Sequence, residues 1–195
     1  MVERTKVITP PFRVSFPSIF EPSSYQGGDP KYSLAMLFYP AKFSEADKKA
    51  FAALKAAADA AGMDKFKKAV KDFPDNMRRP LRRGEEKAHL EGYGEGCVFA
   101  TASSKQRPGL IDRDKQDILD KDAFYPGCWA RATVTAYAYD NKGKGVAFGL
   151  HNIQKLGDGE NFTGRVAADE DFGDDASAVW GDDTPVTEKA DDPLA

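Results

Sequence analysis

The feature that most constrains the fold is a strict alternation of side-chain type along residues 128–139. The even positions are small and apolar: Cys128, Ala130, Ala132, Val134, Ala136 and Ala138. The odd positions are larger or polar: Trp129, Arg131, Thr133, Thr135, Tyr137 and Tyr139. A period of two predicts a β-strand with one closely packed face and one displayed face. Residues 140–143 have turn composition and residues 146–156 form an apolar return, so the pair predicts a hairpin.

Three earlier segments also predict strands. Phe12, Val14 and Phe16 alternate with polar residues and form the apolar side of a first strand. Prolines at positions 10, 11, 17 and 22 should confine it to a short or edge-like run. A second strand follows at residues 32–38, and a third is expected at 97–105. The hairpin brings the total to five strands.

One helical insertion is expected after the second strand. Ser44 and Asp47 have the spacing of a capping box, and Gly62 is expected to end the helix. A shorter helix should follow at 64–72, whereas residues 74–96 and 108–127 are expected to be irregular, with one helical turn near 117–119. The predicted fold class is therefore mainly β, a five-stranded barrel-like domain with this helical insertion.

Charge divides the chain into two parts. Residues 1–167 hold 27 Lys and Arg against 21 Asp and Glu, a net of +6, whereas residues 168–195 carry a net of −9. We expect a folded domain at 1–160 and an acidic, disordered tail at 161–195. A cationic body with an anionic tail suggests nucleic-acid contact and a partner-binding tail, although an acidic tail that only aids solubility is the alternative. The predicted partner-binding residues of the tail are Asp169, Glu170, Asp171, Asp174, Asp175, Trp180, Asp182, Asp183, Asp191 and Asp192.

Flat rings and cations occur together in the predicted barrel. Single-stranded nucleic acid stacks its bases on aromatic rings while Arg and Lys neutralise phosphates. An arginine run at 78–83, cations at strand ends and the displayed face of the hairpin therefore predict a nucleic-acid site. The candidate residues are Arg13, Lys31, Arg78, Arg79, Arg82, Arg83, Lys105, Arg107, Trp129, Arg131, Tyr137, Tyr139, Lys142 and Lys144. Two alternatives stay open: the rings pack under the helices, and the arginine run is merely solvated.

Catalytic and metal-binding motifs do not emerge from the sequence. The glycine run at 92–96 precedes a strand and lacks the Lys-Ser/Thr of a phosphate loop. His89, His151, Cys97 and Cys128 match no zinc spacing, and the acids at 112–117 lie in charge-alternating sequence. We expect no enzyme activity, no cofactor, no metal and no membrane span. Two unpaired cysteines and the lack of a leader suggest a cytoplasmic protein.

Four segments carry a resemblance to a known family. They are residues 13–22 (RVSFPSIFEP), 31–34 (KYSL), 125–130 (YPGCWA) and 145–156 (GVAFGLHNIQKL), with Asp158-Gly159 just beyond. In this order and spacing they resemble the single-stranded-DNA-binding proteins of tailed bacteriophages. The resemblance implies an OB-fold, a five-stranded barrel that binds single strands for replication and recombination. It identifies no DNA-contacting residue, so the candidates above depend on the residue pattern.

The resemblance also implies partners. The acidic tail would engage other replication or recombination proteins, and a homodimer is left open. Bacterial single-strand binders usually end their acidic tail with an aromatic residue, whereas this chain ends Asp191-Asp192-Pro193-Leu194-Ala195. Trp180 is therefore the aromatic residue expected to replace that tip in docking to a partner. The rival functions are a strand-annealing recombination protein, a protein-interaction or virion-assembly module without DNA binding, and a nuclease.

Overall fold

The computed structural model describes residues 6–24 and 27–164. The chain divides into two units, Met1–Gly164 and Arg165–Ala195, and every described residue belongs to the first. The predicted acidic tail residues, from Asp169 to Asp192, lie outside the described residues. None of the described helices is both long enough and apolar enough to cross a membrane.

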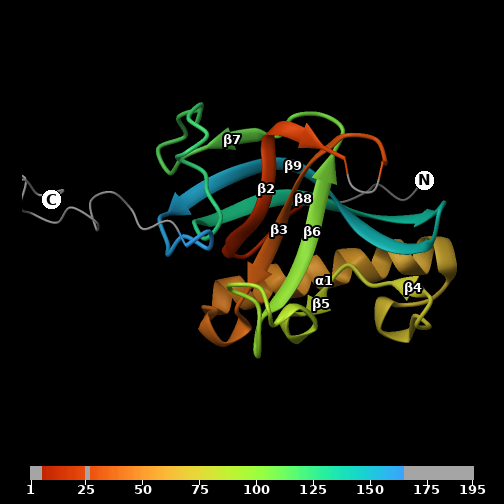
Figure 1. Cartoon of the computed structure of the whole chain (residues 1–195). Helices are drawn as coiled ribbons and strands as arrows, with labels where there is room; N and C mark the ends of the chain where they lie inside the picture. Colours follow the sequence, from red (N-terminus) through yellow and green to blue (C-terminus); the bar gives the residue numbers. More distant parts are fainter. Residues whose placement is uncertain (1–5, 25–26, 165–195) are drawn as a thin grey trace, which may run out of the picture. The chain divides into compact units, whose positions relative to one another are not determined.

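Five strands pair in a ring, which confirms the predicted mainly β fold class. They are β2 (Phe12–Ser23), β3 (Lys31–Phe38), β6 (Val98–Ser104), β8 (Trp129–Asp140) and β9 (Lys144–Gly157). Each pairs with the next in the order β8-β2-β3-β6-β9, and β9 pairs back to β8 (Figure 1). The β2–β8 and β6–β9 pairings involve only two residues on each strand, so the ring is less regular than a closed barrel.

Short elements add to the five strands. Four further strands join the sheet: β1 (Lys6–Ile8), β4 (Met77–Arg78), β5 (Arg82–Arg83) and β7 (Gly109–Ile111). The 3-10 turns are η1 (Pro40–Lys42), η2 (Val70–Asp72) and η3 (Gly84–Lys87). Four of these elements (β4, β5, η3 and β7) lie in the segments 74–96 and 108–127 that the sequence suggested were irregular. Asp117 bridges to Ile111, so the helical turn predicted at 117–119 is wrong. Strands of two or three residues show no hydrophobic period, which is why the sequence did not predict them.

The even positions of β8 face the core, as the alternation predicted. Cys128, Ala130, Ala132 and Val134 are buried in one cluster with apolar residues of β2, β3, β6 and β9. Small side chains on β8 leave room for large ones opposite, and the larger members of the cluster include Phe12, Leu34, Met36, Phe38, Leu54, Phe148 and Ile153.

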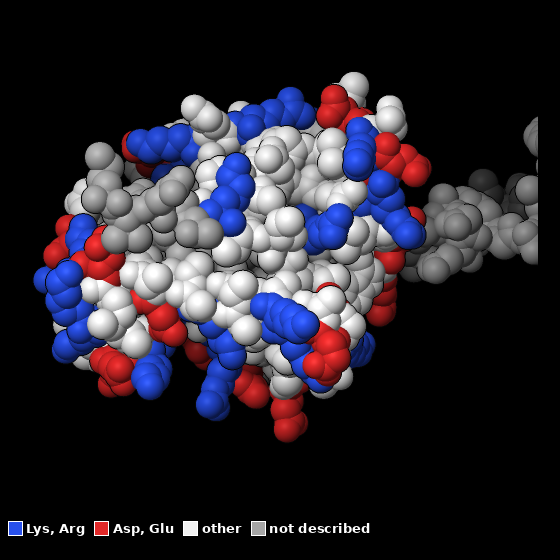
Figure 2. Space-filling view, turned by 180° about the vertical axis from the view of Figure 1, so that it is seen from behind, with Lys and Arg blue, Asp and Glu red and all other residues white. Residues whose placement is uncertain are grey.

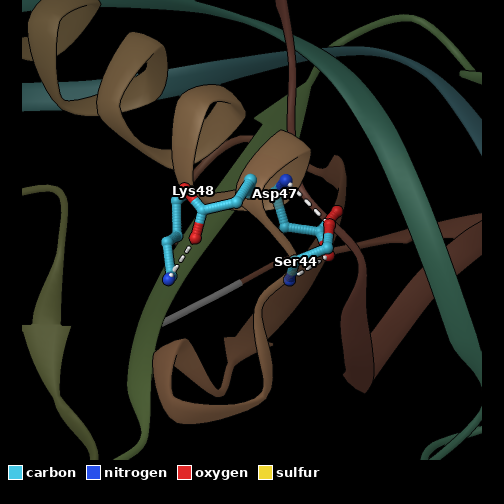
Figure 3. A network of polar contacts seen from close by, with 4 residues as sticks. Ser44, Asp47 and Lys48 are labelled. Carbon is cyan, nitrogen blue, oxygen red and sulfur yellow. Dashed lines mark hydrogen bonds and ion pairs between the residues drawn. The ribbon is translucent and has the colours of Figure 1, made fainter.

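The helix α1 (Glu45–Phe66) begins with the predicted capping box. The Asp47 amide donates to Ser44 Oγ at 3.2 Å, and the Ser44 amide donates to Asp47 Oδ2 at 3.0 Å (Figure 3). An exposed ion pair between Lys48 and Glu45 lies beside it. Reciprocal bonds of this kind satisfy amides that the first helical turn leaves unpaired.

The predicted end of this helix at Gly62 is wrong. The helix continues to Phe66 and ends at Lys67, which is left-handed with φ of 57°. Gly62 is needed for close packing instead, because a Cβ there would lie 2.8 Å from the Lys68 carbonyl oxygen and 2.9 Å from the Phe73 ring. The separate helix predicted at 64–72 is also wrong, because only η2 forms there.

Phe16 is the main departure from the predicted core. It was expected on the apolar side of β2 with Phe12 and Val14, yet its side chain is 60% exposed. A register shift between Ser15 and Ser18 and a φ of 45° at Phe16 turn it out of the alternation. A bulky residue with positive φ costs about 1–3 kcal/mol. The following Pro17 favours an extended backbone at Phe16 and adds to that cost.

Candidate nucleic-acid interface

One register row brings several candidate residues onto the same face. Trp129 of β8 lies opposite Arg13, Arg13 opposite Leu37, Leu37 opposite Phe99, and Phe99 opposite Arg82. Directly opposed residues of antiparallel strands share a face. We call this the outer face: the side of β2, β3 and β6 turned away from the main core. It carries Arg13, Ser15, Ser33, Ala35, Leu37, Phe99, Thr101 and Ser103.

A small second core covers one end of the outer face. Leu37, Tyr93, Cys97 and Phe99 are buried there, with Tyr39, Leu90 and Phe162 packed against them. Cations border this end, because the Arg82 guanidinium lies 5.2 Å and the Lys87 ammonium 5.1 Å from the centre of the Phe99 ring. Arg82 is also paired with Glu86.

Arg13 holds a cluster of aromatic rings together; we call Arg13, Tyr39, Trp129 and Phe162 the Arg13 cluster. Its Nε donates to the Gly127 carbonyl at 2.9 Å and its Nη2 to the Glu160 carbonyl at 2.5 Å. The guanidinium lies 4.3 Å from the Phe162 ring centre and 5.8 Å from that of Trp129. Much of the donor capacity of Arg13 is therefore already used within the protein.

Tyr39 completes this cluster from the end of β3. Its ring packs edge-on to Trp129 at 6.2 Å, and its hydroxyl donates to the Gly92 carbonyl at 2.7 Å. Burial raises the pKa of Tyr39 to about 12, so the hydroxyl stays a donor at any physiological pH. Trp129 is only half-buried, and part of its ring therefore faces solvent.

The middle of the outer face is lined by short side chains. Ser15, Ala35 and Thr101 form one row, and Ser33 and Ser103 form the next. Short side chains let a ligand approach the sheet closely, and Ser33, Thr101 and Ser103 offer hydroxyl groups for hydrogen bonds. Ser15 is buried, and its hydroxyl accepts from Tyr93.

Three cations lie at the opposite end of the outer face; we call Lys31, Lys105 and Arg107 the strand-end cations. Lys31 opens β3, and Lys105 follows the last residue of β6. Lys105 pairs with Asp29 at 3.5 Å, and both side chains are largely exposed. The Arg107 guanidinium lies 5.5 Å from the Phe20 ring centre. An exposed ion pair contributes little, so Lys105 is available to a phosphate.

The hairpin end forms a second group, the hairpin-end cluster of Arg78, Tyr137, Tyr139, Lys142 and Lys144. The two tyrosine rings are half-buried with their centres 6.4 Å apart. Burial raises the pKa of Tyr139, and the nearby charge of Arg78 opposes that shift. Lys142 is exposed at the turn, and Lys144 pairs with Asp140 at 3.4 Å.

The hairpin-end cluster continues the displayed side of β8. Arg131 lies on this side of β8 and donates to Gln154 at 2.8 Å. In Figure 1, β8 and β9 run behind β3 and β6, and Figure 2 views the molecule from that rear side. The surface there is largely uncharged at its centre, with isolated Lys and Arg side chains and most acidic side chains near its rim (Figure 2).

The four arginines of residues 78–83 do not converge. Arg78 lies beside Tyr139, whereas Arg79 turns inward and donates to the Phe73 carbonyl. Arg82 and Arg83 form β5 at the edge of β6. The four side chains of the run therefore lie on separate surfaces rather than in one site.

Five residues near these surfaces were missed from the sequence: Phe16, Phe20, Tyr39, Lys87 and Phe162. Tyr39 directly follows a predicted strand, a position typical of site residues, and this was the available signal. Phe162 lies in the segment assigned to the tail, and nothing local showed that it would pack on Arg13. Its position depends on long-range contacts, including the hydrogen bond that its backbone amide donates to the Pro126 carbonyl at 3.0 Å.

The cysteines and histidines do not assemble a metal site. No group of three or more His, Cys, Asp or Glu side chains within residues 6–24 and 27–164 is placed to hold a metal ion. Cys97 and Cys128 are both buried free thiols, and burial raises the pKa of each to about 11.

These thiols should be inert in the folded protein. At about pH 8 only about one thiol in a thousand is ionised when the pKa is about 11, and the thiolate is the reactive form. We expect negligible labelling by a disulfide reagent under native conditions and two labels per chain in concentrated guanidinium chloride. Native labelling as fast as that of a free cysteine peptide would contradict this burial.

The sequence matches the family described as Enterobacter phage Enc34, ssDNA-binding protein, over residues 5–183. The chain belongs to this family. The resemblance to phage single-stranded-DNA-binding proteins is thereby confirmed. A relative in Acyrthosiphon pisum secondary endosymbiont phage 1, putative protein p50, is 34% identical over 166 residues, covering 83% of this chain and 89% of the relative.

Solved structures show that this Enc34-type chain shares the fold of phage single-stranded-DNA-binding proteins. The bacteriophage Enc34 protein in complex with ssDNA superposes with a TM-score of 0.68 at 20% identity, covering 80% of this chain and 89% of that one. The gp2.5 protein of bacteriophage T7 superposes with a TM-score of 0.53 at 10% identity, covering 86% and 99% of the two chains. At these identities the similarity establishes the fold, and the contacts must be argued from this chain's own residues.

Proposed function

We propose that this protein binds single-stranded DNA on its outer face, with little dependence on sequence. Membership of the Enc34-type family supports the choice of ligand. The observation that carries the location is the arrangement of the outer face: short side chains in the middle, aromatic rings and cations at one end and the strand-end cations at the other. Bases would stack on the rings while the cations neutralise phosphates.

The residues of this surface would have different roles. Trp129, which is partly exposed, would offer its ring for stacking. Arg13 would be a positioning residue: its hydrogen bond to the Gly127 carbonyl holds its guanidinium beside this ring. The strand-end cations, with Arg82 and Arg83, would contact phosphates. Arg79 would have a structural role, because it is bonded to the Phe73 carbonyl.

The hairpin-end cluster and Arg131 extend this proposal. Arg131, Tyr137 and Tyr139 lie on the same side of β8 as Trp129, since all four occupy odd positions of the strand. Arg78, Lys142 and Lys144 lie on β4, in the hairpin turn and on β9. A longer oligonucleotide that leaves the Arg13 cluster along β8 would reach Tyr137 and Tyr139. Binding should therefore strengthen with length beyond the number of nucleotides that the outer face holds.

A fluorescence titration with poly-dT tests the function. The chain has two tryptophans, so a Trp180→Phe background reports on Trp129 alone. We expect quenching of Trp129, and an affinity that falls steeply between about 50 and 200 mM salt because counterions are released. Retained quenching in a Trp129→Phe variant that keeps Trp180 would locate the signal elsewhere, and no binding to poly-dT at low salt would refute the proposal.

In the cell the protein would coat single strands during phage DNA replication or recombination, in the cytoplasm of the bacterial host, without enzymatic activity. A labelled oligonucleotide should therefore remain intact with magnesium present. A gel shift separates this function from a protein-interaction or virion-assembly module. Acceleration of pairing between complementary strands would indicate the annealing alternative.

We also propose that residues 168–195 compete with DNA for the cationic body. The basis is the net charge of −9 in this segment against +6 in residues 1–167. Deleting the segment should tighten binding to an oligonucleotide at low salt, and the difference should shrink as salt screens the charges. Fluorescence anisotropy of the full and truncated chains measures this. Equal or weaker binding by the truncated chain at low salt would contradict the competition.

A further inference from the structure

Phe16 combines backbone strain with an exposed ring. Its φ of 45° lies in the left-handed region, and its side chain is 60% exposed. Folding does not gain much from this side chain, because little of it is buried. The stability of the fold therefore does not explain why Phe16 adopts an unfavourable conformation that exposes its ring. Strained residues concentrate at functional sites, which suggests a role in function.

The surrounding contacts hold the strained conformation in place. Before it, Ser15 is buried and accepts a hydrogen bond from the Tyr93 hydroxyl at 3.3 Å. After it, Ser18 resumes the pairing with Ser33 of β3, and Ile19 is buried in the main core. Both flanks of the bulge are therefore anchored, and the ring at Phe16 cannot turn inward without breaking one of them.

The neighbours of this bulge are those of the proposed DNA surface. Arg13 and Ser15, just before the bulge, belong to the outer face, and Ser18 after it pairs with Ser33 on that face. Further along β2, Phe20 carries the Arg107 guanidinium against its ring. The bulge thus lies between the Arg13 cluster and the strand-end cations.

We propose that Phe16 is a base-stacking residue for single-stranded DNA, held outward by the strained bulge. This inference rests on the proposed function and adds a contact that the sequence pattern had placed in the core. A nucleobase is the occupant that the surroundings favour, because the nearby strand-end cations Lys31, Lys105 and Arg107 would hold the phosphates of the same strand and leave its bases free to meet the Phe16 ring. Stacking on a flat ring accepts any base, in keeping with sequence-independent binding.

Three substitutions separate stacking from mere hydrophobicity. Phe16→Tyr keeps the ring and should bind oligo-dT like the natural protein. Phe16→Leu and Phe16→Ala remove the ring and should weaken binding roughly 5- to 100-fold, the range for loss of one stacked base. Met63→Ala is the control, because Met63 is also a large exposed apolar residue, 48% exposed, but lies on α1. Its affinity should not change.

Phe16→Gly tests the strain independently of DNA. Glycine adopts positive φ without steric cost, so this variant should unfold at the same temperature as the natural protein or higher, while its affinity falls as for Phe16→Ala. A loss of affinity in a protein of undiminished stability cannot come from misfolding.

The outcomes also separate this inference from the function itself. If the natural protein binds oligo-dT and Phe16→Leu and Phe16→Gly bind equally well, the stacking role is overturned and the proposed function stands. If the natural protein does not bind, the proposed function fails first. A second readout is photocrosslinking to iodouracil-containing oligonucleotide: the peptide containing Phe16 should crosslink, and its absence among the crosslinked peptides would count against the contact.

Discussion

Reversing the three strand-end cations together, by Lys31→Glu, Lys105→Glu and Arg107→Glu, should weaken binding to oligo-dT roughly 100-fold or more at low salt. The three side chains lie at one end of the outer face, and Lys105 is held only by an exposed ion pair with Asp29. Each phosphate contact releases counterions, so the slope of log affinity against log salt should fall by about 2. Anisotropy titrations at several salt concentrations measure both quantities.

A matched variant controls for net charge. Lys49→Glu, Lys68→Glu and Lys71→Glu make the same change in charge at exposed positions on and just after α1. If the loss of affinity depends on the outer face, this control should retain most of the binding and most of the salt slope. Equal losses in both variants would mean that only the overall charge matters, and the proposed location would be wrong.

Gly127→Ala should lower the free energy of unfolding by about 2–5 kcal/mol. Gly127 has φ of 107°, and a Cβ there would lie 1.9 Å from the Glu160 carbonyl oxygen. The same glycine accepts a hydrogen bond from Arg13 Nε and donates to the Val14 carbonyl at 2.8 Å. The substitution therefore strains the backbone and disturbs the support of Trp129 together. Denaturant unfolding followed by circular dichroism measures the loss.

Gly157→Ala is the control for this prediction. Gly157 lies at the end of β9 and pairs with Trp129 of β8, and a Cβ on Gly157 would meet no atom within 4 Å. Its stability should stay within about 0.5 kcal/mol of the natural protein. If Gly127→Ala were equally harmless, the close approach of residues 127 and 160 would not exist in solution.

Alternating and capped segments of the fold could be predicted from the sequence. The period of two along β8 predicted which of its side chains would be buried, because only one face of a strand can meet the core. The capping box at Ser44 and Asp47 predicted the start of α1, because those bonds are local. The end of the helix was missed, because Gly62 is explained by contact with Phe73 rather than by helix termination.

The kinds of residue in the candidate site could be predicted from the sequence, but their positions relative to one another could not. The sequence indicated Trp129 and Arg13 separately, and the structure makes them register partners. The arginines at 78–83 were expected to act together in one nucleic-acid site, but Arg79 donates to the Phe73 carbonyl and Arg78 lies beside Tyr139. Which cation meets which ring depends on strand pairing, and pairing between distant segments leaves no local pattern.

By itself, the sequence determined the β class of the fold, the capped helix after the second strand, the charge contrast and the family resemblance. These properties depend on residue types and short spacings, which the chain carries whatever its tertiary structure. Only the tertiary structure decided that Arg13 is bound to the Gly127 carbonyl beside Trp129 and that Phe16 faces solvent. Both outcomes arise from contacts between residues far apart in the chain, where packing and register override the local preference of a side chain.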